Sequence, residues 1–310
     1  GFSAAEIKTI YINNGAQLFP PLNLGQEIWQ RLAQVISALI PRPIAETGPD
    51  DRFPFSYPLF DGTALKKVLE SVFGDAVLKD IQTKSKRLIV TAYNCIHSVP
   101  VIFDSENSEQ HQVKLVDALI ASSAYPGAFP SHVVDGVPLI DGGLVANNPA
   151  LVALTEYVGD EDVPKTGNVL LAAFGSGSTV LSFDTQESQN MGMLDWTFPF
   201  GNPLLSVVFG GHSNITNKVC RILLNAIVGD SSKTSYFRFN PHILTINCVA
   251  SKSIKKDVTD LVFVTKEQKK GFDTANLQYS SKNTLEEIAA QYLQQSDTQE
   301  RIELLVSELV

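Results

Sequence analysis

The sequence predicts an α/β fold in which a mainly parallel sheet is covered by helices on both faces, giving three layers. Short apolar segments rich in β-branched residues alternate along the chain with amphipathic helical segments, which is typical of this class. The 310 residues, 44% of them apolar, can form one large core, so we expect a single domain over residues 1–310. A third observation is the turn Asp141-Gly142-Gly143, which places an acid after a short strand, where α/β enzymes hold working residues.

The first half of the chain is predicted to alternate helices with short strands. A capping box of Ser3 and Glu6 opens the first helix, since each side chain can bond the backbone N–H of the other residue. Apolar residues at helical spacing predict further helices over residues 26–39, 63–73 and 114–124, and Gly74 is expected to end the second of these. Apolar runs predict strands over residues 87–93, 99–103 and 137–140. The Pro- and Gly-rich residues 42–57 indicate a long surface connection.

The second half begins with a helix at Pro149, where the missing N–H of proline costs nothing. The run NVLLAAF over residues 168–174 is the strongest strand prediction, and it leads into the turn FGSGST. Residues 183–211 show the least regular pattern. A further strand is predicted over residues 243–249, and helices are predicted over residues 217–228, 284–293 and 298–309, with Asn283 and Asp297 as caps.

Composition and charge exclude several classes of function. A formal charge of −9 argues against a nucleic-acid partner, because phosphate binding needs a basic face. Three cysteines lie far apart, which fits reduced thiols in a core, and with no metal-ligand spacing we expect neither a metal nor a cofactor. No apolar run is long enough to span a membrane and no signal peptide is visible. These observations predict a soluble chain, compatible with peripheral association at membranes.

The residues LIDGGLVANNPALVAL, 139–154, carry the clearest chemical signal. In a functional interpretation, Asp141 takes a proton from a nucleophile or orients its base, and the glycines leave room for a close approach. In the alternative interpretation, the same residues form an ordinary Asp-Gly turn between a strand and a helix. Asp141 alone favours the interpretation as an ordinary turn, but the neighbouring segments favour the functional interpretation.

Those segments resemble the patatin-like phospholipase family, the lipid acyl hydrolases. ASSAYPGAFP, residues 121–130, is similar to the family's Ala-Ser-x-Ala-x-Pro-x-x-Phe-Pro element, and FGSGS resembles its Leu-Gly-Thr-Gly turn. Weaker similarities follow in the family's order along most of the chain: FSAAEIKTIYINNGAQLFP, YPLFDGTALKKVLESVFGDAVLKD and SYFRFNP.

The resemblance implies a Ser–Asp dyad in which Asp141 is the base. Gly142, Gly143 and Asn147 would support the catalytic loop, and no cofactor would be needed. Two family elements have no counterpart here: the glycine-rich oxyanion segment and the G-x-S-x-G turn that carries the nucleophile. By family order both precede Gly1, so we expect a patatin-like fold that is N-terminally incomplete and begins after the nucleophile helix.

The expected function is therefore ester hydrolysis of the phospholipase A type, on a lipid or phospholipid at a membrane surface, with the serine upstream of this chain. The alternative is a non-catalytic patatin-like module that binds lipid or protein. Because removal of the nucleophile strand would expose backbone and apolar helix faces, a stable chain would need a partner strand, a rearranged sheet or a swapped segment.

Other residues are weaker candidates. Ser3 is better explained as a helix cap than as a nucleophile, because no strand precedes it. Ser176 and Ser178 have glycines at the wrong spacing, and Ser213 lacks the closing glycine. The five histidines fit no triad pattern. The aromatic residues near Met191 are expected to pack over the core or to contact lipid, and the lysines at 252, 255 and 256 to lie on a solvated loop.

Overall fold

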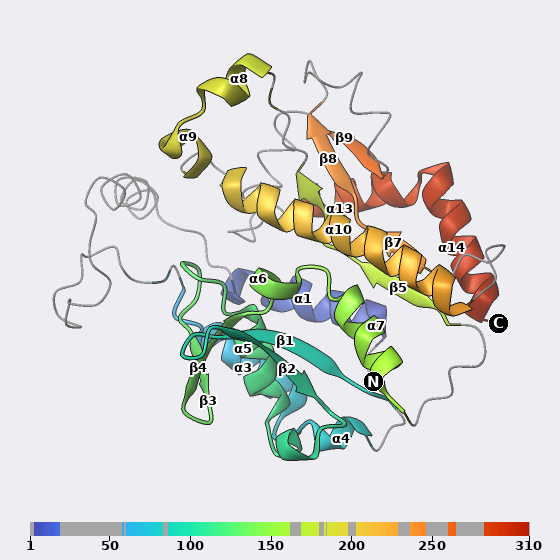
Figure 1. The fold of residues 1–310 in the computed structure, drawn as a ribbon. Helices are drawn as coiled ribbons and strands as arrows, with labels where there is room; N and C mark the ends of the chain where they lie inside the picture. The colour runs from blue at the N-terminus through green and yellow to red at the C-terminus, as the bar shows by residue number, and fades with distance from the viewer. Residues whose placement is uncertain are drawn as a thin grey trace. The chain divides into compact units, whose positions relative to one another are not determined.

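A computed structural model describes residues 3–18, 58, 60–82, 86–161, 169–179, 183, 185–197, 203–228, 236–245, 260–264 and 282–309. The chain divides into two compact units, one formed by residues 1–145 with 277–280, and the other by residues 146–276 with 281–310. Each unit is described by itself (Figure 1). The interpretation of residues 1–310 as a single domain stays a prediction.

The first unit contains a four-stranded sheet with the order β2-β1-β4-β3. Its strands are β1 (Ile89–Asn94), β2 (Val99–Asp104), β3 (His132–Val134) and β4 (Val137–Asp141). The described part of this unit also contains helices α1 (Ala4–Leu18), α3 (Thr63–Phe73), α4 (Lys79–Gln82) and α5 (Leu115–Ser123), and a short 3-10 turn, Ser108–Gln110. The predicted strands and the predicted helices 63–73 and 114–124 are thus present. Most of their observed ends lie within one or two residues of the predicted ends.

All pairings in this sheet are antiparallel, so the expectation of a mainly parallel sheet is wrong here. For the β1–β2 and β3–β4 pairs the reason is the length of the connection, because a parallel crossover needs about a dozen residues or more. The turn between β1 and β2 is four residues long, and the Asn94 side chain accepts from the N–H groups of Ile96 and His97 at 2.8 and 3.0 Å. The turn between β3 and β4 is Asp135-Gly136, with φ of 50° and 80°, the positive values of a tight hairpin turn.

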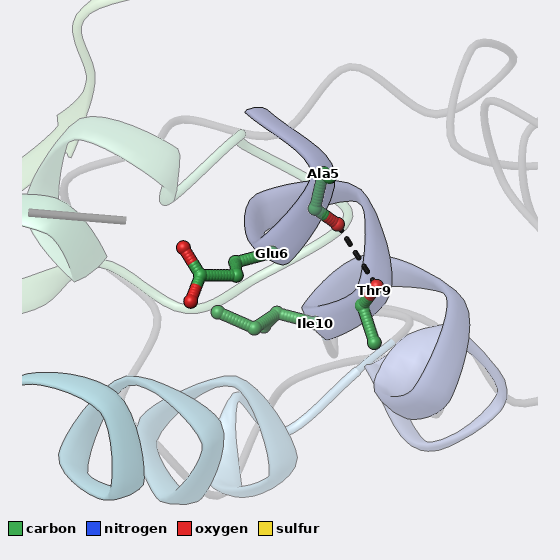
Figure 2. A pocket seen from close by; sticks show the side chains of 4 residues that line it. All are labelled: Ala5, Glu6, Thr9 and Ile10. Atoms are coloured by element: carbon green, nitrogen blue, oxygen red, sulfur yellow. Dashed lines mark hydrogen bonds between the residues drawn. The ribbon is translucent and has the colours of Figure 1, made fainter. Parts of the chain in front are cut away.

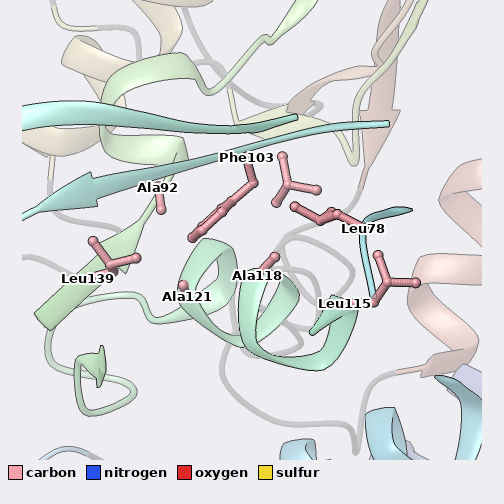
Figure 3. Packing of buried hydrophobic residues seen from close by; sticks show 8 residues of the cluster. Leu78, Ala92, Phe103, Leu115, Ala118, Ala121 and Leu139 are labelled. Atoms are coloured by element: carbon pink, nitrogen blue, oxygen red, sulfur yellow. The ribbon is translucent and has the colours of Figure 1, made fainter. Parts of the chain in front are cut away.

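The core of the first unit lies between the sheet and α5 (Figure 3). Residues of α5 meet residues of three strands there, and Leu78, which lies just before α4, is fully buried. The cluster consists of Leu78, Val90, Ala92, Phe103, Leu115, Ala118, Ala121 and Leu139. Small residues on α5 let the helix approach the sheet closely, which fixes the position of the β4 end where Asp141 lies.

The second unit contains parallel strands. Strand β5 (Leu171–Phe174) pairs with β7 (Tyr236–Phe239), and β8 (His242–Thr245) pairs with β6 (Ser178–Thr179) and β9 (Leu261–Val264). The helices are α7 (Ala150–Gly159), α8 (Thr185–Asn190), α9 (Met193–Thr197), α10 (Pro203–Val228), α13 (Lys282–Leu293) and α14 (Ser296–Leu309). Parallel pairing here agrees with the predicted fold class.

Two apolar clusters show that helices pack on both faces of these strands. Tyr236 and Ala173 pack with α7 and α10, whereas Phe237 and Phe239 pack with α13 and α14. Alternate residues of β7 therefore point to opposite helical layers, as the pleat of a strand requires. Helix α10 is much longer than the predicted helix 217–228, because residues 203–216 continue it toward the N-terminus; of these, residues 203–211 were expected to be irregular. The predicted helix 26–39 and connection 42–57 lie outside the described residues.

Several smaller expectations can be compared with the structure. Gly74 ends α3 with a φ of 57°, and its N–H donates to Glu70. Cys220 is buried as expected, but Cys95 is exposed in the β1–β2 turn. Burial raises the pKa of the Cys220 thiol. Among the described helices, none has the length and apolar character to cross a membrane.

Candidate active site

The DGG turn is held by α5 through the backbone. Asp141 is the last residue of β4, and its N–H donates to the carbonyl of Ala124 at 3.1 Å. The N–H of Gly142 donates to the carbonyl of Ser122 at 3.3 Å. ASSAYPGAFP and DGG, the two motifs that carried the sequence hypothesis, are therefore neighbours in space as well as in order.

The Asp141 carboxylate is partly buried, and little offsets the free-energy cost of burying its charge. Burial raises its pKa above the ordinary value, and a hydrogen bond from the N–H of Gly143, 2.5 Å from Oδ1, opposes that rise. Within the described residues, Gly143 supplies the one hydrogen bond to this carboxylate. A carboxylate with a raised pKa holds a proton more readily, which is a property of general bases and acids in active sites.

Gly142 allows the turn to lie against strand β1. A Cβ atom added at Gly142 would lie 2.0 Å from the carbonyl oxygen of Thr91 and 2.4 Å from its Oγ1. Any side chain at this position would collide with backbone, so the glycine is required by close approach and not by a special φ. The second glycine, Gly143, opens the short helix α6 (Gly143–Ala146) and donates to Asp141.

The two asparagines after the turn have different surroundings. Asn147, the predicted supporting residue, is exposed. Asn148 is almost fully buried, and its Nδ2 donates to Asn217 Oδ1 at 2.9 Å, while its Oδ1 accepts from the N–H of Ala150 at 3.3 Å. Tyr236 donates to the same Asn217 oxygen at 2.6 Å. Asn148 thus orients the start of α7 in the second unit, a role that the sequence did not assign.

Tyr125 is a further neighbour of Asp141 that the sequence analysis missed. Burial raises the pKa of the Tyr125 phenol, and the negative charge of Asp141 raises it further. Tyr125 directly follows the C-cap of α5, and its carbonyl accepts from Ala128 and Phe129 at 3.0 and 2.9 Å. It occupies a variable position of the ASSAYPGAFP motif, so the sequence held no signal for it.

The serines considered as nucleophiles have other roles in the structure. Ser3 forms the predicted capping box, with Ser3 N donating to Glu6 at 2.7 Å and Glu6 N donating to Ser3 Oγ at 3.3 Å. Ser178 Oγ lies 2.8 Å from Nδ1 of His242. Ser213 is buried on α10 and accepts from Arg238.

An open cavity lies beside α1. Its volume is about 350 Å³, and it is lined by Ala5, Glu6, Thr9 and Ile10 (Figure 2). The Thr9 hydroxyl donates to the carbonyl of Ala5 at 2.8 Å, so its polarity is satisfied within the helix. No residue of the predicted site lines this cavity, and the described residues contain no group of acids, histidines and cysteines able to hold a metal ion.

The fold and the site together define an α/β protein with a partly buried acid in a DGG turn. Residues 15–154 match the family model of patatin-like phospholipase. Patatin-like protein 2 of Arabidopsis thaliana is 28% identical over 269 residues, which cover 79% of this chain and 60% of that protein. Patatin-like protein 1 of Oryza sativa subsp. indica is 22% identical over 270 residues, covering 78% and 58%.

A bacterial enzyme shares a shorter region. The cGAMP-activated phospholipase of Vibrio cholerae is 34% identical over 110 residues, which cover 33% of this chain and 30% of that enzyme. Over residues 15–154 the chain is similar to the patatin-like phospholipase family. It spans about three fifths of the length of the two plant relatives.

Proposed function

We propose that this chain is part of a lipid acyl hydrolase in which Asp141 is the base of a Ser–Asp dyad. A serine from a segment N-terminal to residue 1 attacks the ester carbonyl and transfers its proton to Asp141. Asp141 then returns the proton to the leaving alcohol, and water releases the acyl group from the serine. The substrate is a lipid or phospholipid at a membrane surface, and the reaction needs no cofactor.

The observation that carries this proposal is the state of the Asp141 carboxylate. An ordinary Asp-Gly turn gains nothing from a buried acid, because burial disfavours the charged form. Here burial raises the pKa, and one backbone N–H opposes it, so the acid lies closer to the range in which it can exchange a proton. The similarity of residues 15–154, which include Asp141, to the patatin-like phospholipase model supports the same assignment.

The test compares two lengths of the protein with two forms of Asp141. A version extended by the preceding coding sequence should release fatty acid from phosphatidylcholine vesicles, and the chain of 310 residues should not. In the extended protein, Asp141→Asn should reduce the rate by at least about 10³-fold, as expected when a base essential to the nucleophile is removed.

A stability measurement distinguishes loss of the base from loss of the fold. Because the folded state raises the pKa of Asp141, that ionised group weakens the folded state at pH 7, so Asp141→Asn should leave the free energy of unfolding unchanged or increase it. Gly143 N–H can still donate to the amide oxygen of asparagine. An extended and folded Asp141→Asn variant that still hydrolyses lipid would exclude Asp141 as the base. A folded extended protein without hydrolysis would favour the non-catalytic binding module.

A further inference from the structure

Helix α10 is apolar on two opposite faces. One face packs inside the second unit, where Cys220 and Leu224 are fully buried in a cluster with residues of α7, β5 and β7. The opposite face carries an apolar stripe whose side chains are between 46% and 63% exposed: Leu204, Val208, Ile215 and Ile222. A surface helix normally carries polar residues on the face that lies away from its core. The apolar stripe therefore indicates a contact with a partner.

The apolar stripe is continuous along the helix. Its residues are separated by four, seven and seven positions, and each of these spacings returns to the same side of an α-helix. Val207 and Leu223 are exposed too, and they flank the stripe. Helix α9 lies beside the N-terminal end of α10, and its Met193 is 77% exposed (Figure 1). The second unit thus presents an extended apolar surface along α10.

The charged side chains of α10 are both cations. The helix contains no Asp or Glu, although acids outnumber bases by 33 to 24 in the whole chain. Lys218 lies three residues after Ile215 and four before Ile222, so it shares the exposed face, and the next cation, Arg221, is exposed as well. Neither cation forms an ion pair with an acid of α7, α9 or another described element. The acid of α9, Asp195, accepts from a backbone N–H at 2.8 Å.

We infer that this face of α10 is a docking surface for a membrane of anionic phospholipids. The apolar stripe enters the boundary between headgroups and acyl chains, and Lys218 and Arg221 bind headgroup phosphates. Helices that lie in the plane of a membrane interface combine an apolar face with basic residues in this way. Lysine and arginine can lay their apolar stems along the stripe while their charges reach the phosphates. Because α10 lacks the apolar character needed to cross a membrane, it lies along the surface.

A second copy of the chain fits this face less well than a membrane. Two α10 helices facing each other would bring the cations of both copies together, and neither helix has an acid to pair with them. The choice of lipid as the partner rests on the proposed function, but the face and the lipid charge are assigned from α10. All the residues of this surface belong to the second unit, so Asp141 takes no part in it.

The first test is sedimentation of the 310-residue chain with lipid vesicles. Vesicles of equal parts phosphatidylcholine and phosphatidylglycerol should bind the chain at least about 10-fold more tightly than phosphatidylcholine vesicles, because each cation near an anionic surface strengthens binding several-fold. The double variant Lys218→Gln with Arg221→Gln should lose this preference. Lys67→Gln with Lys79→Gln removes the same charge from exposed positions of α3 and α4 and should change the affinity less than about twofold.

A second pair of variants tests the apolar stripe. Val208 and Val306 are both 52% exposed, and both lie on helices of the second unit. Val208→Gln should weaken binding to the mixed vesicles by about 3- to 10-fold, because it removes part of the free energy gained by burying a valine. Val306→Gln should change the affinity less than about twofold. Circular dichroism checks that each variant folds, and Ile215→Gln decides the question if Val208→Gln does not fold.

Several results would overturn the inference: binding to neither kind of vesicle, equal affinity for both, or equal losses in Val208→Gln and Val306→Gln. Sedimentation velocity without lipid tests the second copy, since a dimer that Val208→Gln dissociates would assign the face to self-association instead. Vesicle binding by the 310-residue chain does not require hydrolysis. Its failure would therefore leave the role of Asp141 untouched, and failure of the Asp141 test would leave vesicle binding untouched.

Discussion

At the scale of single residues, Gly142 shows how little space the candidate site leaves. A Cβ there would lie 2.0 Å from the Thr91 carbonyl oxygen, and a backbone atom cannot move aside like the end of a side chain. We expect Gly142→Ala to lower the free energy of unfolding by about 3 kcal/mol, the upper part of the usual range for overpacking. Urea unfolding followed by circular dichroism measures this change.

Gly159→Ala is the matched control. Gly159 is the last residue of α7, and nothing lies within 4 Å of its Cβ position. Alanine there should leave stability unchanged or raise it by up to about 1 kcal/mol, because alanine has the higher helix propensity. Similar losses in both variants would show that the close approach to Thr91 is not what selects glycine at 142.

The same scale shows what sequence could reveal about the site. Asp141 and its glycines were recognisable because their order and spacing are a local pattern. Tyr125 was not, because its importance comes from burial and from the charge of Asp141, which lies 16 residues further along the chain. Asn147 and Asn148 are adjacent and chemically identical, so only the structure could show which of them is buried.

At the scale of elements, Arg301 fastens α14 to the strands of the second unit. Its Nη1 donates to the carbonyl of Arg238 at 2.8 Å, its guanidinium pairs with Asp260, and its charge lies 5.5 Å from the centre of the Phe239 ring. Asp260 has a φ of 63° just before β9, and its carbonyl accepts from the N–H of His242 at 2.7 Å. One arginine therefore joins a helix to two strands.

Arg301→Met should destabilise the fold, because it leaves the Asp260 carboxylate buried without its cation. Breaking a buried pair costs about 3–5 kcal/mol, and the lower end, about 3 kcal/mol, is expected here because Arg301 is 23% exposed. Lys66→Met breaks the exposed pair with Glu70 and should cost less than about 0.5 kcal/mol. Urea unfolding of both variants measures the difference, and equal losses would contradict the role given to Arg301.

Helices and strands could be predicted where the sequence pattern that indicates them lies within a short stretch of the chain. The helix 63–73 was found with both its boundaries because its apolar stripe and Gly74 lie within a dozen residues. The pairing of strands was not predictable in the same way. The turn Asp135-Gly136 is a hairpin signal, but the strand before it, β3, has only three residues and shows no alternating pattern.

At the scale of the whole molecule, composition predicted the α/β class but not its division into an antiparallel and a parallel part. Both parts use short apolar strands, and the class pattern of alternating helices and strands is the same for each. The difference lies in the connections, which are four and two residues long at the antiparallel hairpins. In the second unit, the connection from β5 to β7 includes α10, and a connection of that length permits these two strands to pair in parallel.

Stability of the folded chain against acid should depend on His242. Burial lowers the pKa of His242; the charge of Asp260 opposes this and that of Arg238 adds to it. Histidine in the unfolded chain has a pKa of about 6.5, so just below this pH the unfolded chain binds a proton that the folded chain does not bind. The free energy of unfolding should fall as pH drops below about 6.5, by at most about 1.4 kcal/mol per pH unit from this group, until the folded-state pKa is reached.

His242→Gln removes the group that binds this proton. The free energy of unfolding should then change less between pH 7.5 and 5 than in the parent chain, whatever the effect of the substitution at pH 7.5. Ser178→Ala keeps the histidine and removes only the hydroxyl 2.8 Å from its Nδ1. Because burial is the larger cause, the Ser178→Ala chain should retain the slope of the parent. Urea unfolding at a series of pH values gives all three slopes. A His242→Gln chain as acid-sensitive as its parent would show that another group limits stability in this range.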